Sequence, residues 1–570
     1  MVKKWRVNIL EFNENTQNLA KVLNGDLKIA GLLMERGIST FEEAKSFFRP
    51  SLNNLHDPFL MKDMLKAVER INLAFEKKEK IMVFGDYDVD GTSATALVFT
   101  FLKSKYDLLE YYIPDRYLEG YGISYKAIDI AQQKNISLII ALDCGIRAHD
   151  KIDYANQKNI DFIICDHHLP SETLPNAKAI LDPKREDCQY PFKELSGCGV
   201  GFKLMQALCR KKNWDENELF DYLDLVAISI ASDIVSITNE NRTLAYFGLQ
   251  KINEKPRIGI KALLEVSKKS DALNLSDLVF IIGPRINAAG RINTGMNAVE
   301  LMVSNNYEAA LETAKLISED NNTRKDLDKT ITQEALSMIF ENENLQNKKT
   351  TVLFKNDWHK GVIGIVASRL IENFYRPTIM LTESNGKAVG SARSVKDFDV
   401  HEAICACADL LEQFGGHKAA AGLTLKIENV PLFQEKFEQI VAESITPEML
   451  ELTEEIDMEL QFSDITQKFL NVLWQFDPFG PGNMNPVFVS RKVKQFSYAR
   501  IIKDLHLKLF LFQDENPDLK FEAIGFNMIH FRDMLLENEF IDICYHIEAN
   551  YFRGEKKIQL RIKDIKPSYA

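Results

Sequence analysis

Three aspartates spaced two residues apart form the most chemically distinctive motif of this sequence. Asp86, Asp88 and Asp90 follow the apolar run Lys80–Phe84 and are closed by Gly91. Apolar residues then recur at helical spacing, which predicts a strand, an acidic loop and a helix. Neighbouring carboxylates repel each other unless a cation lies between them, and their oxygens suit magnesium or manganese. The alternative is an ordinary surface turn, since Asp and Gly are common turn residues.

Further polar residues follow other predicted strands and one apolar helix. The predicted strands are Lys80–Phe84, Glu110–Ile113, Leu138–Leu142, Phe162–Cys165 and Ala179–Leu181. Helical patterns separate them, which predicts βαβ units and a parallel sheet whose ligands lie at the carboxyl ends of its strands. The residues delivered to that edge are Asp143, Asp166, His167, His168 and Asp233. Four segments that converge in this way predict a two-metal hydrolytic site. For Asp182 we expect only a turn before Pro183.

Composition narrows the class of protein. The 570 residues are 45% hydrophobic and 27% charged, as in soluble globular proteins with several domains. We expect no membrane segment and no signal peptide, because no apolar run reaches about 18 residues. Eight cysteines without a CxxC pair argue against a disulfide framework or a zinc site and favour the cytoplasm. The net charge of −12 does not favour nucleic-acid binding, although a basic groove can lie within an acidic protein.

The patterning predicts an α/β protein with a C-terminal β-barrel. We expect a helical lead-in at 1–60, a parallel-sheet domain at 61–296, a connecting helix at 297–345, a second α/β domain at 346–450 and a barrel at 451–570. The charged face of the connecting helix should be solvated. In the second α/β domain, Asp399 to Glu402 predicts a helix start, and Gly415-Gly416-His417 its C-terminal end. Five strands within the last segment suggest an OB-fold.

The motifs resemble those of a known family. Asp166-His167-His168 together with the Asp86–Gly91 loop resembles the DHH phosphoesterases. Further motifs resemble the RecJ exonucleases within that family, in the same order along nearly the whole chain: Pro114-Asp115-Arg116, Gly120-Tyr121-Gly122, Ser196–Gly201, Pro284–Arg291, Gly390–Ser394, Gly415–His417 and Phe479–Asn483. The resemblance implies a DHH catalytic domain, a DHH-associated domain joined to it by the long helix, and an OB-fold that binds nucleic acid.

The resemblance also implies an activity. It is that of a 5′-to-3′ exonuclease on single-stranded DNA, which hydrolyses phosphodiester bonds with two Mn²⁺ or Mg²⁺ ions and releases 5′-mononucleotides in DNA repair and recombination. A single-strand-binding protein and other repair factors are the implied partners, and we expect a monomer. Two alternatives stay open. One is a DHH phosphodiesterase that cleaves short oligonucleotides, which needs no barrel. The other is an inert DNA-binding scaffold, which has no reason to keep the metal ligands together.

The resemblance assigns roles to residues at the predicted site. The metal ligands are Asp86, Asp88, Asp90, Asp143, His167 and Asp233, with Asp143 shared by both ions. His168 binds the scissile phosphate or protonates the leaving group, and Asp166 orients a histidine. One position departs from the family. Many DHH members carry a histidine where this chain has Phe84, so Asp86 must supply or support that ligand.

The expected DNA contacts are basic or lie in glycine loops. By resemblance, Arg116, Ser391 and Arg393 hold the terminal 5′ phosphate, for which the arginine fork is suited. Arg285 and Arg291 contact the backbone farther along the strand. His417 lies in a glycine loop that a DNA backbone can approach. In the barrel, the trailing strand would be held by Arg491, Lys492 and Lys494.

Overall fold

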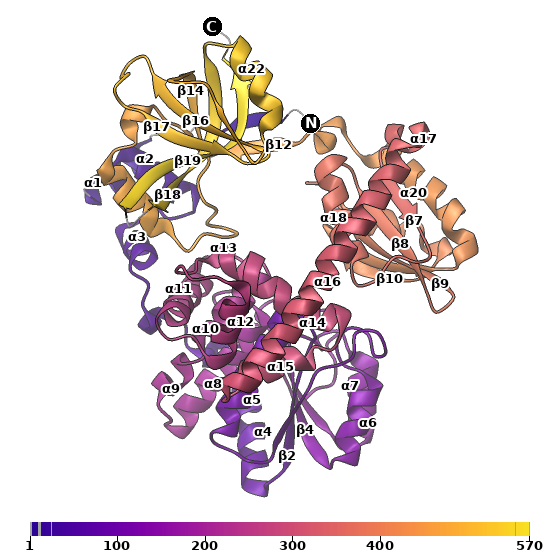
Figure 1. Cartoon of the computed structure of the whole chain (residues 1–570). Coiled ribbons are helices and arrows are strands. Elements are labelled where there is room, and N and C mark those ends of the chain that lie inside the picture. The colour runs from indigo at the N-terminus through magenta and orange to yellow at the C-terminus, as the bar shows by residue number, and fades with distance from the viewer. Residues whose placement is uncertain (1–2, 9–12, 24, 553–554, 569–570) are drawn as a thin grey trace. The chain divides into compact units, whose positions relative to one another are not determined.

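The computed structural model describes residues 3–8, 13–23, 25–552 and 555–568 (Figure 1). It divides into two compact units, each of which combines distant parts of the sequence. One unit holds residues 50–445 and 478–482, and the other holds residues 1–49, 446–477 and 483–570. Among the described helices, none is long and apolar enough to cross a membrane.

The larger unit contains the predicted parallel sheet. Its order is β3-β2-β4-β5-β6, and every neighbouring pair is parallel. The strands are β2 (Lys80–Gly85), β3 (Leu109–Tyr112), β4 (Ile136–Leu142), β5 (Asp161–Cys165) and β6 (Ala179–Leu181). The predicted fold class is therefore confirmed. Side chains of β2 alternate between two apolar cores, because successive residues of a strand point to opposite faces.

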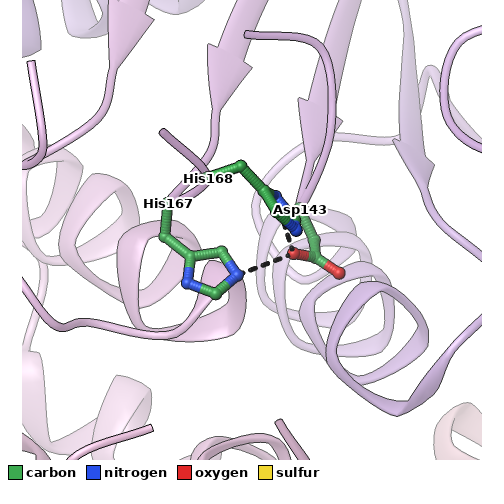
Figure 2. A group of neighbouring side chains, drawn as sticks. All are labelled: Asp143, His167 and His168. Carbon is green, nitrogen blue, oxygen red and sulfur yellow. Dashed lines mark ion pairs between the residues drawn. The ribbon is translucent and has the colours of Figure 1, made fainter. Parts of the chain in front are cut away.

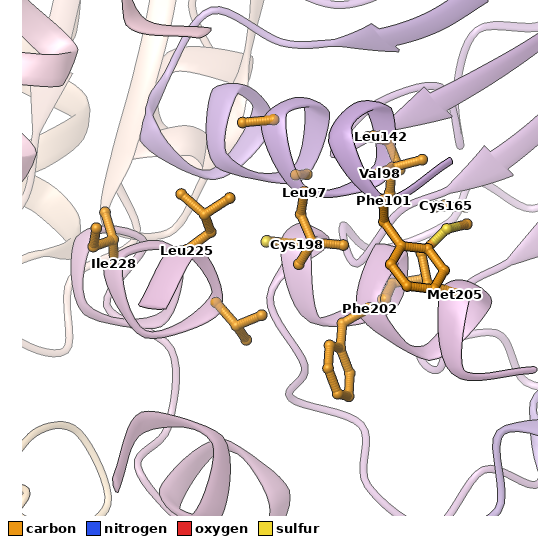
Figure 3. Packing of buried hydrophobic residues seen from close by; sticks show 14 of the residues in the cluster. Leu97, Val98, Phe101, Leu142, Cys165, Cys198, Phe202, Met205, Leu225 and Ile228 are labelled. Atoms are coloured by element: carbon orange, nitrogen blue, oxygen red, sulfur yellow. The ribbon is translucent and has the colours of Figure 1, made fainter. Parts of the chain in front are cut away.

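Helices bury the two faces of this sheet. One face is covered by α4 (Met64–Lys77), α5 (Val89–Lys103), α8 (Gly197–Lys212) and α10 (Leu223–Ser232), and the other by α6 (Tyr125–Gln133) and α7 (His149–Gln157). Figure 3 shows Val98 of α5, Met205 of α8 and Leu225 of α10 in one apolar cluster. The remaining helices of this part are α9 (Glu216–Phe220), α11 (Asn239–Glu254), α12 (Ile258–Ser267), α13 (Leu275–Asp277), α14 (Gly283–Ile292) and α15 (Met296–Val303). This packing fixes the helix ends that border the carboxyl edge of the sheet.

The long helix α16 (Tyr307–Phe340) leads from these helices to the second sheet (Figure 1). The prediction that its charged face is solvated is wrong for its middle, where Asp320, Arg324 and Asp328 are buried. Asp328 lies 2.8 Å from Nε of Arg369 and 3.7 Å from Nη1 of Arg324. Buried charges of this kind require such partners.

The second sheet has the order β10-β11-β9-β8-β7. Its strands are β7 (Thr351–Phe354), β8 (Thr378–Ser384), β9 (Lys387–Arg393), β10 (Leu411–His417) and β11 (Ala420–Leu425), and its helices are α17 (Glu343–Asn347), α18 (Ile363–Asn373), α19 (Val400–Cys405) and α20 (Val430–Ser444). The helix predicted to end at Gly415-Gly416-His417 ends at Cys405 instead. Those glycines lie in β10, where a Cβ on Gly416 would come within 2.4 Å of the Ala420 carbonyl. The glycine signal therefore reflects strand contact rather than a helix cap.

The smaller unit joins the N-terminal segment to the barrel. The predicted helical lead-in contains α1 (Glu14–Val22), α2 (Leu27–Glu35) and α3 (Phe41–Phe48), and Thr40 and Glu43 form a capping box at the start of α3. The prediction of a purely helical segment missed β1 (Lys4–Val7), which pairs in parallel with β12 (Thr453–Ile456). Pairing with a strand so distant in the chain leaves no local helical or turn signal in the sequence.

The barrel is one sheet of order β13-β14-β18-β19-β17-β16-β15, with a further pairing of β14 to β16. Its strands are β13 (Met458–Glu459), β14 (Phe488–Gln495), β15 (Arg500–Ile502), β16 (His506–Gln513), β17 (Phe521–Gly525), β18 (Ile541–Phe552) and β19 (Glu555–Pro567), with helices α21 (Gln467–Leu473) and α22 (Arg532–Glu537). Residues 488–502 contain two of these strands, β14 and β15, which are separated by residues 496–499. Buried and less buried residues alternate along β16, as expected for a barrel wall.

Removing the Trp5 side chain should destabilise the smaller unit. Trp5 packs against the core of Ile456, Val487 and Cys544, and its indole Nε1 donates to Asp564 at 2.8 Å. For Trp5→Ala we expect a loss of about 2 kcal/mol in the free energy of unfolding of this unit, measured by urea denaturation of the full chain.

Arg6→Ala is the matched control on the same strand. The Arg6–Glu455 ion pair is exposed on both sides, so its loss should cost less than about 0.5 kcal/mol. Equal denaturation midpoints for Trp5→Ala and the parent chain would show that β1 does not anchor this unit.

Candidate metal centre and anion site

The triple-aspartate loop connects β2 to α5. Asp88 caps α5 by accepting a hydrogen bond from the Gly91 N–H at 3.0 Å. Asp86 and Asp90 are buried. A Cβ on Gly91 would lie 2.5 Å from the backbone nitrogen of Asp86, so the glycine that closes the motif is required by close packing of the loop. The spacing of the motif therefore places one carboxylate at the helix start and two in the protein interior.

Asp90 is held by the N-terminal end of α8. Its carboxylate accepts hydrogen bonds from the backbone N–H groups of Gly197 and Cys198 and from the Ser229 hydroxyl, each at 2.7 Å. The positive end of the helix favours a negative charge here. Gly197 also allows the close approach of Asp143, whose Cβ would lie 2.7 Å from a Cβ at that position. The glycine-rich motif that begins at Ser196 thus positions two of the predicted ligands.

Asp90, Asp143 and Asp233 converge on His167. Its Nε2 lies 3.1 Å from Asp143, 3.4 Å from Asp233 and 3.6 Å from Asp90. Figure 2 shows the rings of His167 and His168 directed at the carboxylate of Asp143. Two groups of potential ligands result, Asp143-His167-His168 and Asp90-His167-Asp233, and they share His167. The structure therefore brings four of the six predicted metal ligands together around one imidazole.

The unsatisfied atoms of this cluster fit a divalent cation. Both ring nitrogens of His167 and Oδ1 of Asp143 are buried without a hydrogen-bond partner in the described structure. Buried polar atoms without a partner are rare in folded proteins. Nitrogen and oxygen donors of these types suit Mn²⁺ or Mg²⁺. The donor set thus matches the predicted metals.

The electrostatics of the cluster also favour a bound divalent cation. Burial raises the pKa of Asp143 well above its usual range, and repulsion from Asp90 and Asp88 raises it further. Burial and the same two carboxylates raise the pKa of Asp233. A cation between these groups would remove both penalties, because it offsets lost hydration and mutual repulsion.

Three arginines form a second cluster. Burial and the charges of Arg116 and Arg393 together lower the pKa of Arg291 to about 10. Nη1 of Arg393 donates to the Ser391 hydroxyl at 3.0 Å. Among the described ion pairs, none joins these three guanidinium groups to a carboxylate. Partly buried guanidinium groups of like charge form an anion site.

The N-terminal part of α18 borders this anion site. A Cβ on Gly364 would lie 2.7 Å from the Ser391 hydroxyl and 2.9 Å from Nη2 of Arg393, so glycine is required there. Nη1 of Arg291 donates to the carbonyl of Gly361 at 3.0 Å. The predicted phosphate residues Arg116, Arg291, Ser391 and Arg393 are therefore neighbours, although they come from both α/β domains.

Comparison with known proteins places the chain in a family. The DHH family, N-terminal domain, matches residues 80–230, the DHHA1 domain matches residues 347–443, and the RecJ OB domain matches residues 456–564. The single-stranded-DNA-specific exonuclease RecJ of Bacillus subtilis (strain 168) is 36% identical over 97% of this chain and 69% of its own length. The protein of the same description from Escherichia coli (strain K12) is 34% identical over 88% of this chain and 90% of its own length. This chain belongs to the RecJ family.

Solved RecJ structures share the fold. The Mn²⁺ complex of RecJ from Thermus thermophilus has a TM-score of 0.85 at 24% identity, and covers 100% of this chain and 80% of that one. Another exonuclease RecJ bound to manganese has a TM-score of 0.60 at 28% identity, over 70% of this chain and 98% of that one. The order of DHH domain, DHHA1 domain and barrel in this RecJ-family chain agrees with the predicted architecture.

The position that departs from the wider DHH pattern is part of the core. Phe84 is buried and stacks on Tyr112, with 5.9 Å between ring centroids. Asp86 accepts a hydrogen bond from the Gly122 N–H at 3.1 Å, while its second oxygen is buried without a partner in the described structure. Neither Asp86 nor Asp88 belongs to the two ligand groups around His167. Their roles as direct ligands stay predictions.

Asp166 holds His168 as the sequence predicted for an orienting carboxylate. It accepts from Nδ1 of His168 at 2.8 Å, and its other oxygen accepts from the Ile146 N–H at 2.9 Å. The Nε2 of His168 lies 3.3 Å from the Tyr121 hydroxyl. Burial lowers the pKa of His168, but the bond to Asp166 and nearby carboxylates outweigh it and raise the pKa to about 9. His168 is therefore a half-exposed cation beside the metal ligands.

Two residues near the candidate sites, Asp182 and Lys360, are not marked as site residues by the sequence pattern around them. Asp182 forms the expected turn through the Lys184 N–H, yet its side chain is fully buried and burial raises its pKa to about 7. Lys360 lies over the ring of Tyr117, 4.5 Å from its centroid, and the Tyr117 hydroxyl donates to the Arg291 carbonyl. The motif Trp358–Gly361, which combines aromatic, basic and glycine residues, is the signal that could have identified this part of the anion site.

Other predicted DNA contacts lie beside or outside these two clusters, and burial together with the nearby charges of Arg393 and His168 lowers the pKa of His417. Nη1 of Arg285 donates to the Ile281 carbonyl, while Nε of the same guanidinium is buried without a partner in the described structure. His417 is exposed at the end of β10 and accepts from the Ala419 N–H. In the barrel, Arg491 pairs with Glu459 and Asp542, and the ammonium of Lys494 is likewise bound by two carboxylates. These ion pairs weaken the prediction that Arg491 and Lys494 hold DNA.

Replacing Asp166 should change the pH dependence of the site. Asp166→Asn removes the negative partner of His168 Nδ1, so the pKa of His168 should fall. Any step that needs protonated His168 is lost as pH rises through that pKa. We expect the alkaline limit of kcat to move from near pH 9 toward neutrality by at least about one unit.

The measurement is the pH–rate profile of parent and variant, with circular dichroism as the control for folding. An alkaline limit that stays in place in a folded Asp166→Asn protein would mean that Asp166 does not set the charge of His168.

Proposed function

We propose that this chain is a metal-dependent exonuclease that degrades single-stranded DNA from its 5′ end and releases 5′-mononucleotides. The RecJ relatives in Bacillus subtilis and Escherichia coli are single-stranded-DNA-specific exonucleases by description. A catalytic metal cluster and a cationic anion site within the same unit support the same activity for this chain.

The observation that carries the proposal is the junction of the two clusters at Tyr87. This residue lies between Asp86 and Asp88, and its ring carries the guanidinium of Arg116 at 4.9 Å from the centroid. A Cβ on Gly290, next to Arg291, would lie 2.7 Å from the Tyr87 carbonyl oxygen. A terminal phosphate held by the arginines would therefore lie beside the metal ligands. A short distance between the bound terminal phosphate and the metal ligands favours removal of one nucleotide at a time.

The ligand set would hold two Mn²⁺ or Mg²⁺ ions. Asp90, Asp143, His167 and Asp233 form its centre, and Asp86 and Asp88 flank it in the same loop. When bound, the ions supply Lewis acidity and lower the pKa of water. Solved RecJ structures contain Mn²⁺ or Mg²⁺, in keeping with these ligands.

The protein's own groups would complete the hydrolysis. Water adds to phosphorus, the bond from phosphorus to the 3′ oxygen breaks, and that oxygen takes up a proton. His168, charged and half exposed, is suited to bind the scissile phosphate or to donate this proton. Asp166 fixes the ring through Nδ1. Arg393, Arg116 and Ser391 would hold the 5′ phosphate and so set the polarity.

The proposal also covers the domain limits, the oligomeric state, the cellular role and the location of the protein. We retain the predicted domain limits, and we propose a monomer that acts in DNA repair and recombination with a single-strand-binding protein. Eight cysteines without disulfides support a reducing, cytoplasmic location.

Digestion of end-labelled single-stranded DNA in Mn²⁺ tests this function. We expect label to leave a 5′-labelled strand first, as a mononucleotide, and duplex DNA to be resistant. Asp143→Asn is the matched inactive variant, because Asn tolerates the left-handed φ of 60° found at Asp143. It should lose hydrolysis by at least about a thousandfold and still bind DNA in a gel-shift assay.

Two results would contradict the proposal. One is release of a 3′ label first, and the other is no cleavage of single-stranded DNA in either metal. Activity retained in Asp143→Asn would instead remove Asp143 from the metal site.

Arg393→Ala should remove the preference for a 5′ phosphate. The parent enzyme should cleave 5′-phosphorylated strands about tenfold or more faster than 5′-hydroxyl strands, because a charge-assisted bidentate contact is lost with the phosphate. In the variant the two rates should be equal. Lys387→Ala, at the other end of β9, should keep the preference. If Arg393→Ala slows both substrates by the same factor, the arginine does not read the terminal phosphate.

A further inference from the structure

Ile234 has a backbone conformation that its side chain disfavours. Its φ is 57°, in the left-handed region. The other described non-glycine residues with positive φ are Asn, Asp or Lys, so Ile234 is the one apolar, β-branched residue among them. A β-branched residue is a true outlier in this region, because Cβ and its substituents crowd the backbone.

The position itself calls for glycine. Helix α10 ends with Asp233 as its C-cap, whose N–H donates to the Ser229 carbonyl, and Ile234 is the next residue. Helices that end with a left-handed residue at this place most often use glycine. The conformation therefore gives no reason for isoleucine.

Packing gives no reason either. Ile234 is 65% exposed, whereas Val235 packs on the core and Ile237 is fully buried. An exposed apolar side chain on a strained backbone is disfavoured twice. Strain of this kind is found where function depends on the residue.

Ile234 borders the open side of the metal cluster. Asp233 reaches His167 at 3.4 Å, and its side chain is 28% exposed, compared with 2% for Asp143. On the other side, the hydroxyl of Ser232 would lie 2.7 Å from a Cβ on Gly283, the first residue of α14. The same helix carries the predicted DNA contacts Arg285 and Arg291. Ile234 therefore directly follows a predicted metal ligand and is two residues from the side chain that meets the helix of the predicted DNA contacts.

We propose that the Ile234 side chain contacts the sugar and base of the nucleotide at the scissile phosphodiester and so positions the strand over the metal ligands. This inference rests on the proposed exonuclease function. A branched apolar side chain packs against any deoxyribose and base edge, which suits cleavage without sequence preference. Glycine would relieve the backbone but offer no contact. The substrate class is a single deoxyribonucleotide strand.

The experiment compares Ile234→Gly, Ile234→Val and the control Lys268→Gly. Lys268 is exposed, ends α12 with a φ of 56° and is remote from both clusters in sequence. Both glycine variants should unfold at a urea concentration no lower than the parent. Ile234→Gly should lose about tenfold in kcat/KM on single-stranded DNA, chiefly through KM, because an apolar substrate contact is lost. Ile234→Val should keep most activity, and Lys268→Gly all of it.

The affinity for Mn²⁺, measured by calorimetry on the full chain, separates substrate contact from support of Asp233. We expect it to be unchanged in Ile234→Gly. Unchanged kcat/KM, a weakened Mn²⁺ affinity or an earlier unfolding midpoint in Ile234→Gly would each overturn the proposal. If the parent chain does not cleave single-stranded DNA at all, the proposed function fails instead, and that result is read from the parent alone.

Discussion

The convergence of buried carboxylates on the imidazole of His167 is the constraint on which the larger unit depends. Three acids within 3.6 Å of one nitrogen cannot remain charged in a buried site without compensation. The protein compensates Asp90 with the N-terminal end of α8 and the Ser229 hydroxyl. The positive charges of His168 and Lys184 supply part of the compensation for Asp233. A bound cation would supply the rest for Asp143 and Asp233. The same repulsion therefore favours the binding of a metal ion at this site.

Close backbone packing makes this convergence possible. Gly91 lets the acidic loop fold against Asp86, and Gly197 lets α8 approach Asp143. The second site uses the same device, since Gly364 lets α18 approach Ser391 and Arg393. In each place a methyl group would occupy space already taken by a functional side chain or its backbone. Gly91, Gly197 and Gly364 are therefore packing requirements of the two sites.

Tyr87 connects the acidic cluster of the larger unit to its cationic cluster. Tyr87 belongs to the loop of the acids, yet its ring supports Arg116 of the cationic cluster. The acidic loop is thus connected through Tyr87 to Arg116, whereas Arg291 of α14 and Arg393 of β9 reach the cationic cluster from other elements. His168 extends this arrangement, because Asp166 keeps it cationic among the acids.

The sequence by itself predicted the parallel sheet, the barrel and the residues that the structure gathers around His167. Strand periodicity and polar residues at strand ends are local signals, so residue types alone place Asp143 and His167 at one sheet edge, while Asp233 is marked by the end of an apolar helix. Only the tertiary structure decided which acids meet His167, that Phe84 fills the core, that Asp182 is fully buried and that β1 pairs with β12. It also turned Gly415-Gly416-His417 from a helix end into a strand, and the charged face of α16 into a buried network. Those outcomes depend on contacts between residues distant in the chain, whose energies no local pattern of residue types contains.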